Sequence, residues 1–257
     1  MQIKIKCPAK INLDLKVFPL NSNGYHPIKS TMQAINLFDY LTISISNGNE
    51  IVLNGNSNEI PYDEKNICHK AAKLFLQTIQ KKYRIEVYIE KNIPVCAGLA
   101  GGSTDAAGVL FGLNELLNRP LNKNKLHRLA SQLGSDLNFC LEGGRQLCEG
   151  RGEILTAQDF VDFPVTLIKP KNLQISAAKA YSAFDELKEE SNISNDLEFA
   201  LLDKYKELQF LHSKGFQMSG SGPTFFTLKE KLNFKFDENY QVIDNLKAIN
   251  YGVNEIK

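Results

Sequence analysis

The chain has 257 residues, of which 43% are apolar and 23% charged, and its formal net charge is +1 at pH 7. This length suits two moderate domains, and the charge balance gives no support for binding to nucleic acid or to an anionic membrane. No apolar run approaches the ~20 residues that span a bilayer, and the five cysteines lack CxxC spacing. We expect a cytoplasmic protein, either a monomer or a homodimer, whose partner is a small molecule.

Alternating apolar residues predict strands in the first part of the chain. They occupy every second position within 3–17 and 41–45, as in half-buried strands. Asn47-Gly48-Asn49 is typical of a hairpin turn, which would lead from the second strand into a third at 50–53. A stripe of apolar residues from Ile67 to Ile79 then predicts an amphipathic helix.

The middle of the chain contains its clearest unit. A strand at 85–89 is followed by a glycine-containing loop from Pro94, and then by the apolar stripe of a helix over 106–117. A second helix is expected at 123–133, with Asn122 as its N-cap. Strand, glycine loop and helix in this order place any chemistry of the loop at a helix N-terminus.

A domain boundary is expected within 155–162, which gives an N-terminal domain of residues 1–157 and a C-terminal domain of residues 158–257. The elements predicted beyond it are a strand at 165–168, a helix at 176–187, a longer helix at 196–212, a strand at 224–228 and a helix that begins near Glu238. This alternation predicts an α/β or α+β protein, and the class alone indicates no function.

The segment from Pro94 to Ala107 is the strongest candidate for a ligand site. Its glycines Gly98, Gly101 and Gly102 let the backbone approach a ligand closely and adopt positive φ. Successive N–H groups would then form an anion cradle at the positive end of a helix. The alternative is a tight turn with small residues for packing. Neither the GxxxxGK[ST] loop nor the GxGxxG pattern matches, so we expect a nucleotide phosphate site of a third kind.

Three motifs in chain order resemble those of the GHMP kinases. They are Pro8 to Leu13, the glycine loop from Pro94 to Thr104, and Met218 to Thr224. The resemblance covers nearly the whole chain and implies a two-domain α+β GHMP kinase fold. Its N-terminal domain would be ribosomal-S5-domain-2-like, and its C-terminal domain a ferredoxin-like α/β plait. The resemblance also implies ATP and Mg²⁺ as cofactors and phosphoryl transfer to an alcohol.

Four shorter segments are similar to one branch of this family, whose acceptor is diphosphocytidyl-methylerythritol in the non-mevalonate isoprenoid pathway. They are Asn23 to His26, Leu133 to Asp136, Glu149 to Glu153 and Asn195 to Glu198. The resemblance implies phosphorylation of the 2-hydroxyl of this acceptor. Two alternatives stay open: another GHMP kinase, such as homoserine kinase, and a catalytically silent relative that only binds nucleotide.

Lys10 and Asp136 are the catalytic residues that the resemblance implies. Lys10 and Asn12 alternate with apolar neighbours, so both side chains lie on one face of a strand. Asp136 would accept the proton of the attacking hydroxyl, and Lys10 would keep it ionised. Without the resemblance, Asp136 is an ordinary loop aspartate and Lys10 a solvated strand residue. A pure binder needs no base, so the presence of both argues against a silent relative.

ATP binding is assigned by the resemblance to the glycine loop and to Asn66. The loop residues are Pro94, Gly98, Leu99, Ala100, Gly101, Gly102, Ser103 and Thr104. Asn66 is equally well explained as the N-cap of a helix. Mg²⁺ would be held through ATP, with the hydroxyl of Ser103 or Thr104 within its reach, and the sequence leaves the number and the ligands of the ions open.

The acceptor side resembles a cytosine site with two aromatic faces, Tyr25 and Tyr181, and with His26 reading the edge of the base. Tyr181 also lies in an apolar helical stripe, so core packing is the alternative. The other substrate-binding residues implied are Asn12, Gly220, Ser221 and Gly222. One position departs from the family: Asn138 stands where a proline is common, which affects the stiffness of that loop rather than its chemistry.

Overall fold

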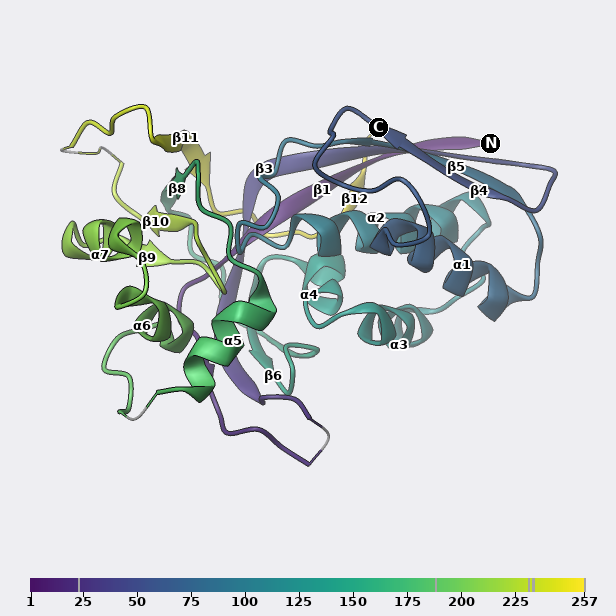
Figure 1. Ribbon diagram of the computed structural model, residues 1–257. Helices are drawn as coiled ribbons and strands as arrows, with labels where there is room; N and C mark the ends of the chain where they lie inside the picture. The colour runs from purple at the N-terminus through teal and green to yellow at the C-terminus, as the bar shows by residue number, and fades with distance from the viewer. Residues whose placement is uncertain (23, 188, 231, 233, 257) are drawn as a thin grey trace.

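The computed structural model consists of two β-sheets with helices packed against them (Figure 1). It describes residues 1–22, 24–187, 189–230, 232 and 234–256. Within this described part of the chain, no helix is long and apolar enough to cross a membrane. The mixture of helices and antiparallel sheet agrees with the predicted α+β class.

Two long antiparallel strands, β1 (Gln2–Asn12) and β3 (Ile28–Ser46), organise the larger, eight-stranded sheet. The strand order is β12-β1-β3-β5-β4, while β2 and β6 pair with the first half of β3 and β7 pairs with β6. The further strands are β2 (Lys16–Val17), β4 (Ile51–Gly55), β5 (Arg84–Glu90), β6 (Arg145–Glu149), β7 (Ile154–Ala157) and β12 (Asn254–Glu255).

The predicted hairpin at Asn47-Gly48-Asn49 is wrong. The turn connects β3 to β4, but β5 lies between these strands, antiparallel to β3 and parallel to β4. Ile85, Val87 and Ile89 of β5 are buried, which favours its central position in the sheet. Strands that are consecutive in sequence usually pair, and here a strand from later in the chain takes the place between them.

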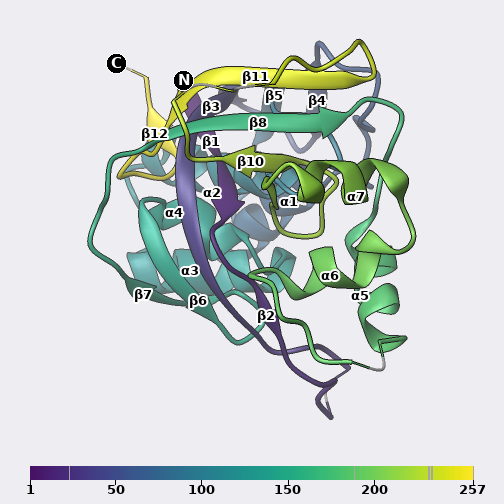
Figure 2. The same ribbon diagram turned by 90° about the vertical axis from the view of Figure 1, so that its left-hand side faces the viewer.

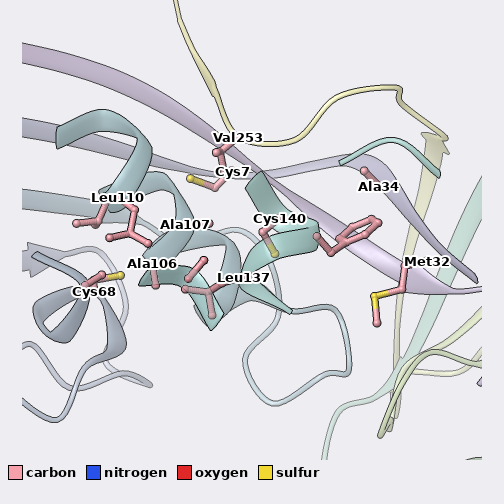
Figure 3. Close-up of a cluster of buried hydrophobic side chains, with 14 of the residues drawn as sticks. Cys7, Met32, Ala34, Cys68, Ala106, Ala107, Leu110, Leu137, Cys140 and Val253 are labelled. Atoms are coloured by element: carbon pink, nitrogen blue, oxygen red, sulfur yellow. The ribbon is translucent and has the colours of Figure 1, made fainter. Parts of the chain in front are cut away.

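Four helices cover one face of this sheet: α1 (Ile67–Ile79), α2 (Gly101–Leu116), α3 (Lys123–Leu133) and α4 (Leu137–Glu142) (Figure 1). Small residues let α2 lie close to the strands: a Cβ atom on Gly112 would lie 2.6 Å from Cδ1 of Ile43. The core around α2 includes Cys7, Ala106, Ala107, Leu110 and Cys140 (Figure 3). This close packing fixes the N-terminus of α2, where the glycine loop ends.

The smaller sheet contains β8 (Pro164–Pro170), β9 (Gln217–Met218), β10 (Phe225–Thr227) and β11 (Tyr240–Lys247). Its order β11-β8-β10-β9, with all pairs antiparallel, is the fourth-first-third-second order of a ferredoxin-like plait. Among the described residues between β10 and β11 there is no second crossover helix. Phe234 and Phe236 instead pack against Phe210 and Tyr240 in this region.

Two helix predictions in the second half are wrong. The expected helix at 196–212 is two helices, α6 (Asp196–Leu202) and α7 (Lys206–Ser213), because Tyr205 adopts an extended conformation between them. The helix expected near Glu238 is the strand β11. A bulge at Asn245, whose φ is 56°, interrupts its alternation, so its more buried positions are spaced three apart and resemble a helical stripe.

The remaining helix, α5 (Ala177–Asp185), begins after its N-cap Ser176 and lies beside α6 (Figure 1). Figure 2 shows β8, β10 and β11 crossing in front of β1 and β3. Gln33 on β3 links the larger sheet to the segment that follows β11 of the smaller sheet. Its Nε2 donates to the carbonyl oxygen of Ile249, after β11, at 2.9 Å, and to that of Gly144, before β6, at 3.2 Å. Residues at the end of β1, the start of α2 and the start of α5 line one cavity.

Candidate active site

A cavity of about 660 Å³ lies between the two sheets. It is lined by residues of the glycine loop, by Lys10 and Asn12 at the end of β1, and by Asp136. Tyr181, Gly220 and Ser221 line it from the second half of the chain. Most of the predicted site residues, distant in sequence, therefore face one cavity large enough for a small-molecule ligand.

The glycine loop combines positive φ values with a helix start, and its role as an anion cradle stays a prediction. Positive φ occurs at Cys96 (51°), Gly98 (72°) and Ala100 (60°), and α2 begins directly afterwards. Ala100 provides no side-chain cap, and the first N–H groups of any helix lack intrahelical partners. We predicted that the glycines would supply the left-handed positions, but Gly101 and Gly102 are already helical, and Ala100 takes the last such position instead.

Gly98 connects the glycine loop to the C-terminal glycine motif. A Cβ atom there would lie 2.9 Å from the nitrogen of Gly222, and the positive φ also disfavours any side chain. The Gly98 carbonyl oxygen accepts hydrogen bonds from Ser219 Oγ and Lys10 Nζ, both at 3.0 Å. Both glycine motifs and Lys10 are thus held together by one peptide group.

Lys10 and Asp136 lie next to each other, as the resemblance implies. Lys10 Nζ is 3.9 Å from Asp136 Oδ2 and donates to Asn12 Oδ1 at 2.5 Å. The Lys10 side chain is only 5% exposed, whereas that of Asp136 is 28% exposed toward the cavity it lines. Asn12 Nδ2 donates in turn to Ser30 Oγ at 2.7 Å. The ammonium group is therefore fixed, while the carboxylate remains accessible to a ligand.

Asp136 occupies the N-cap position of α4 but makes no side-chain cap hydrogen bond, so its carboxylate is left for the cavity. Two residues later, Asn138 is buried and its Nδ2 donates to Ser131 Oγ at 2.9 Å and to the Glu153 carbonyl at 3.0 Å. These hydrogen bonds hold the turn from α3 to α4. They supply the stiffness that a proline at this position would give.

The predicted ATP residues separate into two groups. Pro94, Gly98 to Ser103 and Asn66 line the cavity. Thr104 does not: it is fully buried, and its Oγ1 has no hydrogen-bond partner among the described residues. Asn66 is the N-cap of α1, with Oδ1 accepting from Cys68 N at 2.8 Å. The capping role is confirmed, and its contact with adenine stays a prediction.

On the acceptor side, Tyr181 lines the cavity and His26 stacks against it, with ring centroids 5.5 Å apart and an interplanar angle of 23°. Burial, with a further contribution from the Asp136 carboxylate, raises the pKa of Tyr181 to about 12. His26 is engaged on both nitrogens: Nδ1 lies 2.8 Å from the Phe18 carbonyl oxygen, and Nε2 3.2 Å from Asp185 Oδ1. The predicted edge reader does not line the cavity here.

Tyr25 is 52% exposed and does not line the cavity. Its ring instead lies 4.9 Å from the guanidinium carbon of Arg151, a cation–π contact. Arg151 itself lines the cavity. The structure therefore brings Tyr181 to the site but leaves Tyr25 beside it, and a cytosine sandwich between the two tyrosines stays a prediction. Gly222 also lies outside the cavity lining, where it packs on Met218.

Known proteins were compared with this chain. Residues 66–144 match the GHMP kinases N terminal domain. A 4-diphosphocytidyl-2-C-methyl-D-erythritol kinase of Clostridium tetani is 39% identical over 253 residues, covering 87% of this chain and 90% of that protein. The enzyme of the same name from Syntrophomonas wolfei is 36% identical, covering 94% of this chain and 96% of that protein. This chain belongs to the 4-diphosphocytidyl-2-C-methyl-D-erythritol kinase family.

Solved structures place that family within the wider fold. A crystal structure of 4-(cytidine 5'-diphospho)-2C-methyl-D-erythritol kinase superimposes with a TM-score of 0.74 at 28% identity, over 90% of each chain. A homoserine kinase from Cytophaga hutchinsonii gives the same TM-score at 16% identity, over 99% of this chain and 97% of that one. The second likeness shows the fold alone, and the GHMP kinase fold that we predicted is confirmed.

Among the segments that resemble the 4-diphosphocytidyl-2-C-methyl-D-erythritol kinase branch, Asn195 to Glu198 holds the backbone of the C-terminal glycine motif. Asn195 Nδ2 donates to the carbonyls of Met218 and Gly220, each at 2.9 Å, and so holds the C-terminal glycine motif. Glu198 Oε2 accepts from Met218 N at 2.8 Å. Asn23 lies outside the described residues. Of these four segments, Ser135, Asp136, Arg151 and Leu197 line the cavity itself.

A buried charge cluster beneath the glycine loop was missed. Lys91 Nζ contacts carboxylates of both Asp39 and Asp105, the latter at 2.8 Å, and all three side chains are at most 5% exposed. Asp39 Oδ1 accepts from the N–H groups of Asn92 and Ile93 at 2.6 and 2.8 Å, which fixes the start of the loop. Burial, followed by the Asp39 charge, raises the pKa of Asp105 to about 8, although Lys91 opposes this.

The cluster leaves two carboxylates for one ammonium group. Burial alone lowers the pKa of Lys91, but Asp105 and Asp39 raise it well above its usual value. Asp39 accepts hydrogen bonds from two backbone N–H groups, whereas Asp105 Oδ1 has no hydrogen-bond partner in the described structure and burial raises the pKa of Asp105. Asp105 is therefore the group that takes up a proton. A charged residue inside an alternating strand, such as Asp39, was the available signal.

Proposed function

We propose that this protein transfers the γ-phosphoryl group of ATP to the 2-hydroxyl of 4-diphosphocytidyl-2-C-methyl-D-erythritol, giving the 2-phosphate and ADP. The observation that carries the proposal is the Lys10–Asp136 pair beside the glycine cradle in one cavity. Relatives with this enzyme name match most of the chain. A silent nucleotide binder would need the cradle but not an accessible carboxylate next to a buried ammonium group.

Asp136 would act as the general base. The acceptor hydroxyl oxygen attacks the γ-phosphorus, its proton passes to Asp136 Oδ2, and the bond from phosphorus to the bridging oxygen of ADP breaks. Lys10, fixed by Asn12 and Gly98, would favour the ionised form of Asp136 and orient the hydroxyl. Phosphoryl transfer depends mainly on such positioning and charge neutralisation.

The first turn of α2 would hold the phosphates. The N–H groups of Gly101, Gly102 and Ser103 lie at the positive end of a 16-residue helix and line the cavity. Searching the described residues finds no cluster of three His, Cys, Asp or Glu side chains suited to a metal. Mg²⁺ would therefore be held chiefly by ATP, with the Ser103 hydroxyl rather than the buried Thr104 as its protein ligand, and would neutralise phosphate charge.

The acceptor would bind on the opposite side of the cavity, with its cytosine against Tyr181 and its erythritol near Asn12, Gly220 and Ser221. Tyr181 is the one predicted aromatic face that lines the cavity. Closure of Tyr25 onto the base, and release of His26 from Asp185, would complete the cytosine site. We further propose that the enzyme acts in the cytoplasm as a monomer or homodimer, consistent with five free cysteines.

ADP release with a panel of alcohols tests this proposal. Diphosphocytidyl-methylerythritol should give turnover far above the ATPase background, whereas homoserine and mevalonate should not. Turnover with homoserine alone would favour the other GHMP kinase. Nucleotide binding without ADP formation from any alcohol would favour the silent relative. Phosphorus NMR of the product should show a new phosphomonoester on the erythritol unit, next to the intact diphosphate.

A further inference from the structure

A second, polar cavity of about 530 Å³ lies on the other side of the glycine loop from the candidate active site. Its walls come from the loop after β4, from residues 91–95, and from the adjoining ends of β8 and β11. The two cavities share Lys91, Pro94 and Val95 in their linings, and only the first contains Lys10 and Asp136. The second cavity therefore borders the proposed active site but does not contain its catalytic pair.

Lys169 is the unusual residue of this second cavity. On β8 it follows Val165 and Leu167 at every second position, so its side chain lies on the face that packs against Ile93 and Leu99. It is nevertheless a lysine, and it is only 9% exposed. A buried ammonium group at the end of an apolar face destabilises the fold unless something compensates its charge.

The described part of the chain provides no such compensation. Lys169 Nζ has one hydrogen bond, at 3.5 Å, to the carbonyl oxygen of Pro170, and it has no carboxylate within ion-pair distance. The other buried lysine of the wall, Lys91, shows the contrast, because Asp39 and Asp105 both contact it. Lys169 therefore keeps donors available toward a cavity that it lines.

The rest of the wall suits a hydrophilic anion. Lys171 adds a second ammonium group with no acidic partner among the described residues, and Glu59 is the one acidic residue of the lining. Gln241 pairs with Lys169 across the two strands, and Gln174 adds a further amide. Two ammonium groups and two amides can satisfy several phosphate oxygens at once.

We propose that this cavity is a second binding site, for a phosphorylated small molecule, in which Lys169 and Lys171 hold the phosphate. Because Lys91, Pro94 and Val95 line both cavities, an occupant would contact the start of the proposed ATP loop. Occupancy would thereby stabilise or shift that loop and couple the two sites. The inference is independent of the acceptor assigned above.

The probe is inorganic pyrophosphate. Its binding is measured by isothermal titration calorimetry without added Mg²⁺, with the nucleotide site saturated by β,γ-imido-ATP. The wild-type protein should bind pyrophosphate with the nucleotide site filled, and Lys169→Met should weaken this binding at least tenfold. Lys169→Arg should retain it. Lys206 is an exposed lysine on α7 that lines neither cavity, so Lys206→Met should bind pyrophosphate as the wild type does.

Stability gives a second readout. Lys169→Met removes an uncompensated buried charge, so the denaturation midpoint of the variant should equal or exceed that of the wild type. If Lys169 instead stabilised the fold, the midpoint of the variant would be lower. If Lys169→Met does not fold, Gln241→Glu places a carboxylate beside Lys169 and should abolish pyrophosphate binding equally. Complete displacement of pyrophosphate by the nucleotide analogue, or unchanged binding by a folded Lys169→Met, overturns the proposal.

Discussion

The Lys10 ammonium group lies 3.9 Å from Asp136 Oδ2, and the two residues approach the cavity from the end of β1 and the start of α4. The ammonium group is held by Asn12 and Gly98, so it cannot follow the carboxylate if that side chain moves. Lys10 is thus held in place beside the glycine loop, while the Asp136 carboxylate stays accessible from the cavity.

Replacing Asp136 by Asn keeps the shape of the side chain and removes the base. We expect turnover to fall at least about 100-fold, with little change in ATP affinity, because the cradle is made by other residues. Steady-state ADP release and calorimetry of ATP binding check the two parts separately. Asp203→Asn, in the exposed turn between α6 and α7, is the matched control. A variant of Asp136 with nearly normal turnover would show that another group removes the proton.

Gly98→Ala should damage the site more than an alanine at Gly102. The new Cβ at position 98 would press on backbone atoms of Ser219 and Gly222 in a left-handed conformation. At Gly102 a Cβ meets only Ile67, at 3.8 Å, and alanine favours the helix. We expect Gly98→Ala to lose about 1–3 kcal/mol of unfolding free energy in urea titrations, and Gly102→Ala to lose none. Equal stability of the two variants would contradict the close packing of Gly98 against Ser219 and Gly222.

Local signals account for what the sequence predicted well. Asn66, Asn122 and Ser176 cap their helices by side-chain hydrogen bonds to amides two or three residues later, so each start was visible in a short window. Lys10 and Asp136 were found through motifs of a family. The position of β5 between β3 and β4 depends on pairing across the sheet, and the bulge at Asn245 disguised β11. Neither feature is encoded in local periodicity.

The same limit explains the buried cluster of Lys91. Its partners Asp39 and Asp105 lie 52 and 14 residues from it on other elements, and each alone looks like a strand or helix residue with an ordinary charge. Only the tertiary structure shows that they meet. Similarly, Thr104 and Ser103 are indistinguishable in the motif, and the helical turn decides that Thr104 is buried while Ser103 lines the cavity.

The raised pKa of Asp105 predicts a pH dependence of stability. The folded protein holds a proton on Asp105 up to about pH 8, whereas the unfolded chain releases it near pH 4. The folded state thus binds more protons across this window, so the free energy of unfolding should fall as pH rises from about 4 to 8. In Asp105→Asn this part of the decline should disappear, as urea midpoints at several pH values would show. An identical decline in both proteins would mean that Asp105 stays ionised.

Cys96 offers a chemical probe of the glycine loop. It is exposed and lines the first cavity, whereas Cys7, Cys68, Cys140 and Cys148 are buried, and burial raises the pKa of each of these four thiols. Iodoacetamide should therefore modify Cys96 first in the native protein. Saturating ATP with Mg²⁺ should slow this reaction at least about fivefold by covering the loop, as peptide mass spectrometry can measure. Unprotected labelling at saturation would place ATP elsewhere.

Recognition of cytosine is the last prediction, and it separates stacking from hydrogen bonding. Tyr181 should contribute stacking worth about 1–3 kcal/mol, so Tyr181→Ala should lower kcat/KM for the cytidine acceptor and its uridine analogue alike. Stacking cannot distinguish the two bases, because their faces are similar. Discrimination must come from the ring edge, where the cytosine amino group replaces a uracil carbonyl, and an unpaired partner there costs about 1–3 kcal/mol. The wild type should therefore prefer cytidine at least about tenfold.

His26 should carry part of that preference, although here its two nitrogens face Phe18 and Asp185. Reading the base edge requires His26 to leave Asp185, which is 56% exposed and hence a weak partner. His26→Ala should lower the cytidine-to-uridine ratio of kcat/KM. Asp185→Asn should leave this ratio unchanged, because it removes the ion-pair partner of His26 and not the group that reads the base. If His26→Ala kept the full ratio while Tyr181→Ala reduced both rates, the edge would be read by backbone groups. Equal kcat/KM for both nucleotides in the wild type would instead mean that Tyr181 and His26 only pack.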